Sequence, residues 1–356
     1  MGITGRVAAI GSGLAALACG GAMLHAQPAP PAPAADAAPS GEEAFDPVLA
    51  KQIVEKLATA LEENFVRPET GSAYAAAVRA KAASGAYAHF PSAKSFAEAV
   101  TADLQAVAPD RHLRLFPPHA LNLGGAGGGP PPGSSIVKSG WVGDGIAYIS
   151  FRAFFGDEKT LTDLRKFLAD HAAASSLIID AREHRGGGLA EIDLLFAQLF
   201  AQETELVRMD TRLAIEQRGE EAFGDGPTLK RLQGPPTVVR RAHVALPDPH
   251  GSTLAKARVF LLTSGRTASA AEHLALSLKR THRALLIGET TRGAGNYGHT
   301  VDLGGGYGAF IPFGRTFDPD TGEGWEGVGV KPDVEVPADK ALDEAIRRAS
   351  SPASAL

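Results

Sequence analysis

The fold is decided by the segment Arg258-Val-Phe-Leu-Leu-Thr-Ser-Gly-Arg-Thr-Ala-Ser269-Ala-Ala-Glu272. Its first part, Val259 to Leu262, is apolar and partly β-branched, which predicts a short buried strand. Gly265 interrupts this run, and from Ala268 onward helix-forming residues dominate. We therefore expect Ser269 at a strand-to-helix junction, where free N–H groups and the helix dipole stabilise negative charge. This position suits a nucleophile, and it equally suits a serine that only caps the helix.

Strands and helices alternate on both sides of this segment from residue 140 onward. The predicted strands are 146–151, 176–180, 259–262 and 284–287, and the predicted helices are 160–173 and 189–201. Repeated β-α units predict an α/β domain, with helices packed on a sheet, over residues 140–340. Residues 203–258 are polar and irregular, so we interpret them as an insertion. Residues 341–356 should form a terminal helix and a frayed tail.

The region before residue 140 has a different character. Apolar residues recur at helical spacing between residues 45 and 107, which predicts three helices: one ended by Pro68 and Gly71, then 74–83 and 95–107. Three amphipathic helices joined by short turns predict a small helical bundle, which we place at residues 45–116. Residues 117–139 are rich in Gly and Pro and are expected to link the bundle to the α/β domain.

The N-terminus has the layout of a secretory signal peptide. One positive charge precedes an apolar stretch from Val7 to Leu24, and Ala26 offers a small residue at the cut. We therefore predict a signal peptide at residues 1–26, a Pro/Ala-rich linker at 27–44, and export to the periplasm or the exterior. An uncleaved anchor is the alternative. Cys19, the single cysteine, lies in a poor lipoprotein box; if it is lipidated, the domain is tethered to a membrane.

Composition excludes several classes of function. The 356-residue chain has a net charge of −5, with basic residues interspersed among acidic ones, so no nucleic-acid partner is expected. The sequence has no zinc or calcium pattern, no P-loop and no dinucleotide fingerprint, so no metal or cofactor is expected. The Gly-x-Ser-x-Gly elbow of α/β-hydrolases is also absent.

Hydrolysis through Ser269 would need an oxyanion pocket, a base and an orienting group. Gly186 and Gly187 follow a predicted buried strand, so their N–H groups can approach a ligand; the alternative is a simple tight turn. Among eleven histidines, His112 is distinguished by its place at the edge of the helical region. Glu326 lies between a tryptophan and glycines, where an exposed loop carboxylate is the alternative interpretation.

Together these segments resemble the C-terminal processing (tail-specific) serine peptidases. The resemblance is carried by Leu177-Ile-Ile-Asp-Ala-Arg-Glu-His-Arg-Gly-Gly187, by the segment around Ser269, by Ile287-Gly-Glu-Thr-Thr-Arg-Gly-Ala-Gly-Asn296 and by Gly324-Trp-Glu-Gly-Val-Gly-Val-Lys-Pro-Asp333. It implies a ClpP/crotonase-like α/β core preceded by a small N-terminal helical bundle. Residues 112–140 are too few for the PDZ domain that many relatives insert.

One position indicates the branch of the family. The best-known branch uses a Ser/Lys dyad, and Ala294 stands at the position of that lysine. The branch that resembles tricorn protease and the interphotoreceptor retinoid-binding protein uses Ser, His and Glu, which match Ser269, His112 and Glu326. Two departures from the pattern are Arg111, where tricorn protease has a serine, and His184, where asparagine is usual.

The resemblance implies an exported serine-type peptidase that hydrolyses peptide or protein substrates through an acyl-enzyme. Ser269 would be the nucleophile, His112 the base and Glu326 its partner. The N–H groups of Ala270 and of Gly186 or Gly187 would form the oxyanion hole. The alternative is a catalytically inactive ligand-binding protein on the same fold, as in the retinoid-binding relative.

Overall fold

The computed structural model describes residues 43–120 and 133–351. The predicted signal peptide, Cys19 and nearly all of the 27–44 linker lie outside these residues, as does the glycine-rich middle of the predicted 117–139 link. All described residues belong to one packed unit. Within it, no helix has both the length and the apolar character needed to cross a membrane.

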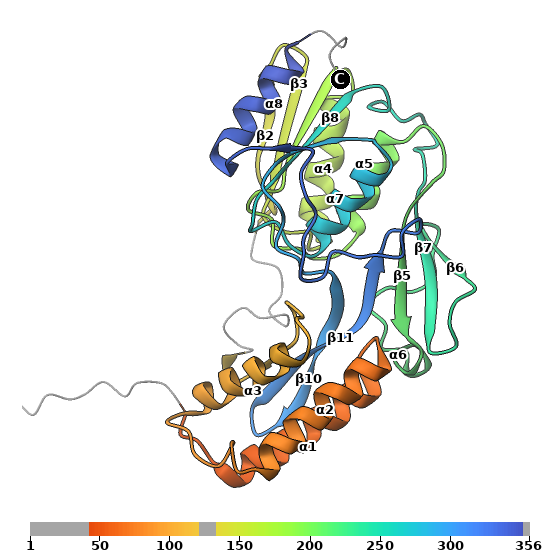
Figure 1. Ribbon diagram of the computed structural model, residues 1–356. Helices are drawn as coiled ribbons and strands as arrows, with labels where there is room; N and C mark the ends of the chain where they lie inside the picture. Colours follow the sequence, from red (N-terminus) through yellow and green to blue (C-terminus); the bar gives the residue numbers. More distant parts are fainter. Residues whose placement is uncertain (1–42, 121–132, 352–356) are drawn as a thin grey trace, which may run out of the picture. The chain divides into compact units, whose positions relative to one another are not determined.

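Strands and helices alternate as the sequence predicts from β3 to α5 and again from β8 to β9 (Figure 1). The helices are α1 (Pro47–Asn64), α2 (Pro68–Ala83), α3 (Ala93–Val107), α4 (Glu158–Asp170), α5 (Ala190–Leu199), α6 (Leu213–Arg218), α7 (Ala270–Arg280), the 3₁₀ helix η2 (Ala338–Lys340) and α8 (Ala341–Ala349). The strands are β1 (Arg114–Phe116), β2 (Ile136–Gly143), β3 (Ile146–Phe151), β4 (Ser176–Asp180), β5 (Thr204–Arg212), β6 (Leu229–Leu232), β7 (Val238–Ala245), β8 (Arg258–Thr263), β9 (Leu285–Gly288), β10 (Asn296–Gly304), β11 (Tyr307–Phe317) and β12 (Val334–Glu335).

A mostly parallel sheet forms the centre of the α/β part. Its strand order is β12-β9-β8-β4-β3-β2, in which only β2, at the edge, runs antiparallel to its neighbour. Side chains alternate between two cores: Val259 and Leu261 of β8 pack with α4, α5 and α7, whereas Phe260 and Leu262 pack with α8. Because both faces are covered, these strands are apolar almost throughout. This mixed α/β architecture, preceded by helices α1–α3, confirms the predicted fold class.

A second sheet is antiparallel and was not predicted. It contains β1, β11, β5, β7 and β6 in that order, and β10 pairs with β11. The interpretation of residues 203–258 as an irregular insertion is therefore wrong, since β5, β6 and β7 lie there. The charged residues of these strands resemble those of a surface loop, but they form ion pairs within the sheet. The Arg240 guanidinium, for example, donates to both oxygens of Asp210 at 2.7 and 2.9 Å.

The three N-terminal helices pack on this second sheet. Their core is completed by Leu303, Tyr307, Ala309 and Ile311 of the β10–β11 hairpin, so helices and hairpin form one hydrophobic cluster. Pro68 does not end a helix but begins α2, where its missing N–H costs nothing.

Gly71 also lies inside α2. A Cβ at this position would lie 2.4 Å from the carbonyl oxygen of Leu61, so glycine permits close packing of α2 on α1.

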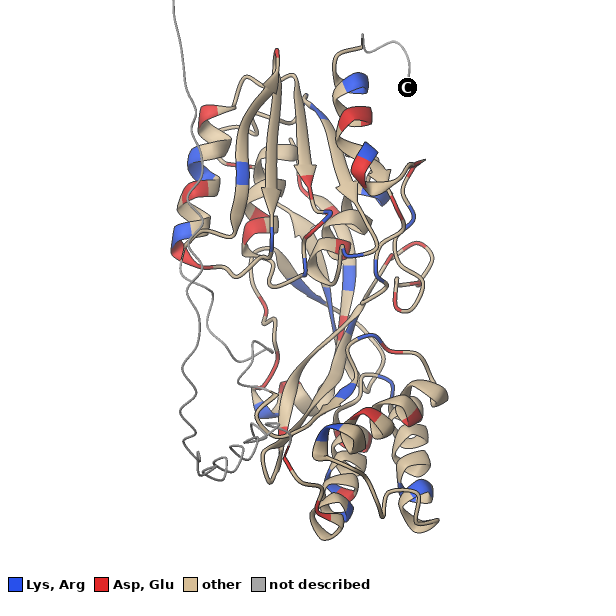
Figure 2. Ribbon diagram, turned by 90° about the vertical axis from the view of Figure 1, so that its left-hand side faces the viewer, with Lys and Arg blue, Asp and Glu red and all other residues tan. Residues whose placement is uncertain are grey.

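The ends of the predicted link also differ in the structure. β2 begins at Ile136, and β1 joins the end of the predicted bundle to β11. Acidic and basic residues are interspersed along the described elements (Figure 2), in keeping with the sequence pattern.

Candidate active site

Ser269 is the residue directly before α7, at the carboxyl-terminal edge of the parallel sheet. Its backbone has φ +56° and ψ −119°, a conformation that non-glycine residues rarely adopt. Strain of this kind costs of order 1–3 kcal/mol and persists only where the surroundings impose it. Ser269 is half-buried, and its main-chain oxygen accepts the N–H of Glu272 at 2.7 Å.

The glycine loop that follows β4 lies against this serine. A Cβ at Gly186 would lie 2.7 Å from the Cβ of Ser269 and 3.2 Å from its Oγ, so only glycine fits. The Gly186 N–H donates to Nδ1 of His184 at 3.0 Å, which makes it a poor candidate for an oxyanion donor. His184 is fully buried, and burial lowers its pKa to about 3, so the ring is neutral and accepts this bond.

The N–H of the second predicted glycine, Gly187, has no hydrogen-bond partner among the described residues. The N–H of Phe154 donates to the carbonyl oxygen of Gly186, and the N–H of Gly188 donates to the carbonyl oxygen of Phe154. Because Phe154 pairs in this way with the residues on both sides of Gly187, the N–H of Gly187 itself points away from Phe154. Gly187, Ser269 and Ala270 line one small cavity of about 30 Å³. Of the predicted oxyanion donors, this cavity therefore brings together Ala270 and Gly187.

His112 lies between α3 and β1, in the segment predicted to carry the base. Its ring stacks on Phe310 with centroids 5.3 Å apart, and its Nδ1 is enclosed without a hydrogen-bond partner among the described residues. Burial lowers the pKa of His112, the nearby Asp110 carboxylate raises it, and Arg114 and Arg292 lower it further. The ring is therefore neutral near pH 7, as a general base must be.

Glu326 lies beside His112. One oxygen of its carboxylate accepts the N–H of Arg111 at 2.7 Å, and the other accepts those of Gly295 and Asn296 at 2.6 and 2.8 Å. Burial and the nearby Asp110 raise the pKa of Glu326 to about 7, against the three N–H donors, which favour the carboxylate. Arg111 thus meets Glu326 through its main chain, a contact that does not depend on the residue type.

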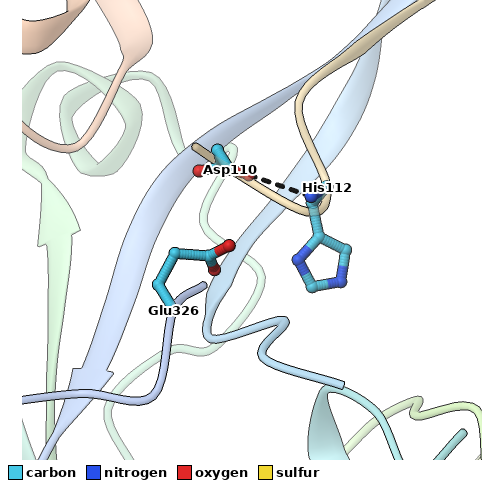
Figure 3. A group of neighbouring side chains, drawn as sticks. All are labelled: Asp110, His112 and Glu326. Atoms are coloured by element: carbon cyan, nitrogen blue, oxygen red, sulfur yellow. Dashed lines mark hydrogen bonds between the residues drawn. The ribbon is translucent and has the colours of Figure 1, made fainter. Parts of the chain in front are cut away.

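Asp110 completes this cluster and was not among the site residues predicted from the sequence. Its buried carboxylate accepts the main-chain N–H groups of His112 and Leu113, both at 2.9 Å, and the side-chain amide of Asn296 at 2.8 Å. Figure 3 shows that the carboxylate of Glu326 faces one side of the His112 ring. The sequence contained a signal for this role, because an Asp side chain can accept the main-chain N–H of the residue two positions later, here the candidate base His112.

These three side chains could also hold a cation. One ligand atom from each of Asp110, His112 and Glu326 lies within 4.8 Å of the others. Every carboxylate oxygen here already accepts at least one protein N–H, so few lone pairs remain for a metal. The arrangement is therefore better suited to orienting an imidazole than to ligating an ion.

Glu272 is a second residue that holds the site in place and that was not predicted from the sequence. It is fully buried, and its carboxylate accepts the N–H groups of Ser269 at 2.8 Å, Gly293 at 2.6 Å and Ala294 at 2.9 Å, and the hydroxyl of Thr291 at 2.5 Å. Burial raises its pKa, and these four donors oppose that shift. A glutamate three residues after a serine at a helix start is the capping-box pattern, which could have revealed it.

The predicted residues thus form two groups connected by one loop. Ser269, Ala270 and Gly187 line the small cavity, whereas His112 and Glu326 lie together with Asp110. Gly295 belongs to both groups, since it lines the small cavity and donates to Glu326. No hydrogen bond joins His112 to Ser269 within residues 43–120 and 133–351.

A larger cavity of about 520 Å³ adjoins the small one. The two share Gly295 and Thr316, and the larger is also lined by Arg67, Tyr74 and Glu326. A space of this volume, with a few convergent polar groups, is typical of a ligand-binding site. An extended chain could therefore run from Glu326 toward Ser269.

Comparison with known proteins places this chain in a family. A model of peptidase family S41 matches residues 145–336, and a model of the N-terminal domain of S41 peptidases in eukaryotic IRBP matches residues 49–122.

Solved structures share the fold at low sequence identity. A photosystem II D1 C-terminal processing protease aligns with TM-score 0.52 and 16% identity over 86% of this chain and 98% of that one. A putative peptidase from Parabacteroides merdae aligns with TM-score 0.59 and 14% identity, covering 86% and 99%. A lipoprotein from Streptococcus agalactiae aligns with TM-score 0.52 and 13% identity, covering 84% and 95%.

Proposed function

Because this chain belongs to peptidase family S41 and is a serine-type peptidase, we propose that it cleaves peptide bonds with Ser269, His112 and Glu326. The observation that carries the proposal is the backbone of Ser269, held at positive φ at the end of β8 with the glycine loop against its side chain. A serine that only capped α7 would need no such strain.

In the first step the Oγ of Ser269 attacks the carbonyl carbon, and His112 takes the hydroxyl proton. His112 then gives this proton to the leaving amine as the C–N bond breaks, which leaves an acyl-serine. Water attacks the ester in the same way: His112 accepts a proton from the water and returns it to Ser269. Glu326 favours the imidazolium that forms in each half of the cycle.

The oxyanion of each tetrahedral intermediate would accept the N–H groups of Ala270 and Gly187. Ala270 is the first residue of α7, so its N–H is one of those without a partner inside the helix. The N–H of Gly187 turns away from Phe154 in the same cavity. A single oxyanion donor typically contributes about 3–4 kcal/mol to the transition state.

The role of Glu326 is supported by its distance from His112 and by its fixed orientation. Ligand atoms of the two lie within 4.8 Å, and three main-chain N–H groups hold the carboxylate in place. Catalytic hydrogen bonds are often long in the free enzyme and shorten when substrate binds. A short movement of the His112 segment would then bring its Nδ1–H onto Glu326.

The test is covalent labelling and turnover of Ser269→Ala. This variant should lose peptide hydrolysis and labelling by a fluorophosphonate, and retained turnover would remove Ser269 from the mechanism. Ser277→Ala is a matched control on the same helix, because the buried Oγ of Ser277 has no partner among the described residues. Labelling of the wild type would also exclude the inactive ligand-binding alternative.

We further propose that the peptidase is exported. Support comes from the sequence alone, since the charged start, the apolar stretch and Ala26 have the layout of a signal peptide. Cell fractionation with N-terminal sequencing of the mature chain tests this proposal. A chain that keeps Met1 and stays in the cytoplasm would contradict it, and a lipid on Cys19 would indicate a membrane tether.

A further inference from the structure

His184 connects the glycine loop after β4 to the segment that carries the nucleophile. Its main-chain oxygen accepts the N–H of Ala268 at 3.0 Å, and Ala268 directly precedes Ser269. Its ring nitrogen Nδ1 accepts the N–H of Gly186 at 3.0 Å, and Gly186 directly precedes Gly187. One residue therefore bonds to the neighbour of the nucleophile and to the neighbour of an oxyanion donor.

The glycine loop needs outside contacts to hold one conformation. Gly186 has φ +107° and Gly187 has φ +132°, and glycine rotates between such conformations and ordinary ones at little steric cost. The N–H of Phe154 donates to the oxygen of Gly186 at 2.8 Å, which fixes the peptide unit between the two glycines. The peptide unit before Gly186 is fixed by His184, the only side chain of the described structure that bonds to the main chain of residues 186–188.

This contact requires one protonation state of the ring. The N–H of Gly186 can only donate, so Nδ1 of His184 carries no proton and Nε2 carries one. The ring stays in this neutral form because burial lowers its pKa to about 3. His184 can therefore accept the bond from the loop at neutral pH and well below it.

The ring of His184 fills a closed space but leaves one of its own groups unpaired. It packs on the ring of Phe154 with centroids 4.0 Å apart and planes at 66°. Its Nε2 is fully enclosed without a hydrogen-bond partner among the described residues, and a buried unpaired donor costs about 1–3 kcal/mol. An apolar side chain of similar bulk would fill the space without that donor. The hydrogen bond made by Nδ1 therefore explains a histidine here better than packing does.

We propose that His184 is a positioning residue, whose Nδ1 orients the glycine loop so that the N–H of Gly187 reaches the oxyanion formed at Ser269. The inference rests on the proposed function, in which Gly187 supplies one of the two oxyanion donors. His184 touches no reacting atom and acts through the main chain of Gly186. Because the oxyanion forms only during the reaction, loss of this contact should lower kcat and leave KM nearly unchanged.

The experiment compares three variants at this position, each measured with a fluorogenic peptide that the wild type cleaves. His184→Asn places its Oδ1 as many bonds from Cα as Nδ1 and can accept the same N–H. His184→Gln carries the same amide one bond farther out, and His184→Leu has no acceptor. We expect the Asn variant to keep kcat within about threefold, and the Gln and Leu variants to lose at least about tenfold at unchanged KM.

Two further measurements separate positioning from a structural role. The end point of a fluorophosphonate titration counts the folded active sites, so kcat is expressed per site. The Oγ of Ser269 adds to the carbon of a peptide aldehyde, and the aldehyde oxygen then accepts the same N–H donors as the oxyanion. The affinity for this aldehyde should fall in the Gln and Leu variants by about the same factor as kcat.

Stability and activity should also rank the variants differently. Asparagine is smaller than the ring of His184 and leaves part of its space empty. The Asn variant should therefore unfold at a lower urea concentration than the wild type and still be the most active of the three variants. A purely structural role would make activity follow stability.

His171→Leu is the matched control. His171 is also buried, and its Nδ1 lies 2.7 Å from the main-chain oxygen of Phe167, at the end of α4 and outside both cavities. The kcat per site and the aldehyde affinity of this variant should match those of the wild type.

Wild-type kcat per site in His184→Leu, or an Asn variant as slow as the Gln variant, would overturn the inference while leaving the peptidase mechanism intact. If the Leu variant does not fold, the comparison of Asn with Gln decides. Absence in the wild type of any hydrolysis or labelling that depends on Ser269 would instead overturn the proposed function.

Discussion

Glu272 and Glu326 hold four consecutive main-chain N–H groups of one loop, two each. Glu272 accepts those of Gly293 and Ala294, and Glu326 accepts those of Gly295 and Asn296, at 2.6–2.9 Å. Glu272 also accepts the N–H of Ser269, and Glu326 that of Arg111, next to His112. Through these hydrogen bonds the loop fixes the main chain at Ser269 relative to the main chain next to His112.

Glu272→Gln should destabilise the protein and slow the enzyme. An amide presents an NH₂ group to at least one of the four donors that the carboxylate satisfies, and a buried unpaired donor costs about 1–3 kcal/mol. We expect a loss of about 2–3 kcal/mol in the free energy of unfolding and at least a tenfold loss in kcat at unchanged KM. Urea denaturation and steady-state kinetics measure the two effects.

Glu191→Gln is the matched control for this substitution. Glu191 is as buried as Glu272, but its Oε1 accepts the N–H of Gly156 and its Oε2 has no hydrogen-bond partner in the described structure. Burial raises its pKa, so a neutral amide suits the site. We expect unchanged or slightly higher stability; a loss as large as that of Glu272→Gln would show that any buried Glu-to-Gln change is harmful.

Gly186→Ala should abolish activity, whereas Gly188→Ala should not. Gly186 has φ +107° and leaves 2.7 Å between an added Cβ and that of Ser269. Gly188 does not have positive φ, and its added Cβ would meet only the Phe154 oxygen, at 3.9 Å. We expect a loss of at least a hundredfold in kcat/KM for the first variant and less than threefold for the second, measured under identical conditions.

Ser269→Gly should be more stable than Ser269→Ala. Both lack the hydroxyl, but glycine adopts φ +56° without strain and alanine does not. The difference in the free energy of unfolding should be about 1 kcal/mol in favour of glycine, as measured by chemical denaturation of the two inactive variants. Equal stability would show that the backbone of Ser269 relaxes in solution.

Activity should fall in two steps as the pH is lowered. The pKa of Glu326 is raised to about 7 by burial, so it takes up a proton first and no longer stabilises the imidazolium. His112, whose pKa burial holds below 6.5, is protonated at lower pH and ceases to act as a base. The profile of kcat/KM against pH should show both limbs.

Glu326→Gln should lower the plateau and remove the upper limb while it keeps the lower one. A single limb near pH 9–10 in the wild type would indicate an amine base instead of His112.

The sequence predicted the parts of the site that lie within one segment. The strand-to-helix junction at Ser269 follows from a local change of hydrophobic pattern, and the parallel sheet follows from repeated β-α units. The hydrogen bond between His243 and His273 could not be predicted from local patterns, because it depends on how β7 packs against α7.

Main-chain contacts and internal charge pairs were also hidden from sequence reasoning. Arg111 departs from the family pattern as a side chain, yet its N–H still reaches Glu326. Strands β5 and β7 look like surface loops because Asp210 and Arg240 are charged, although they neutralise each other inside the sheet. Neither effect is visible from residue type alone.

The nucleophile and its base depend on different hydrophobic cores. Ser269 follows a strand of the parallel sheet, whereas His112 connects the helical layer to β1, in the cluster completed by the β10–β11 hairpin. Local opening of that layer would carry away the base while the serine stayed in a folded scaffold. Detachment of the helices would therefore remove His112 from the active site and stop hydrolysis, although Ser269 would remain at the end of a folded sheet.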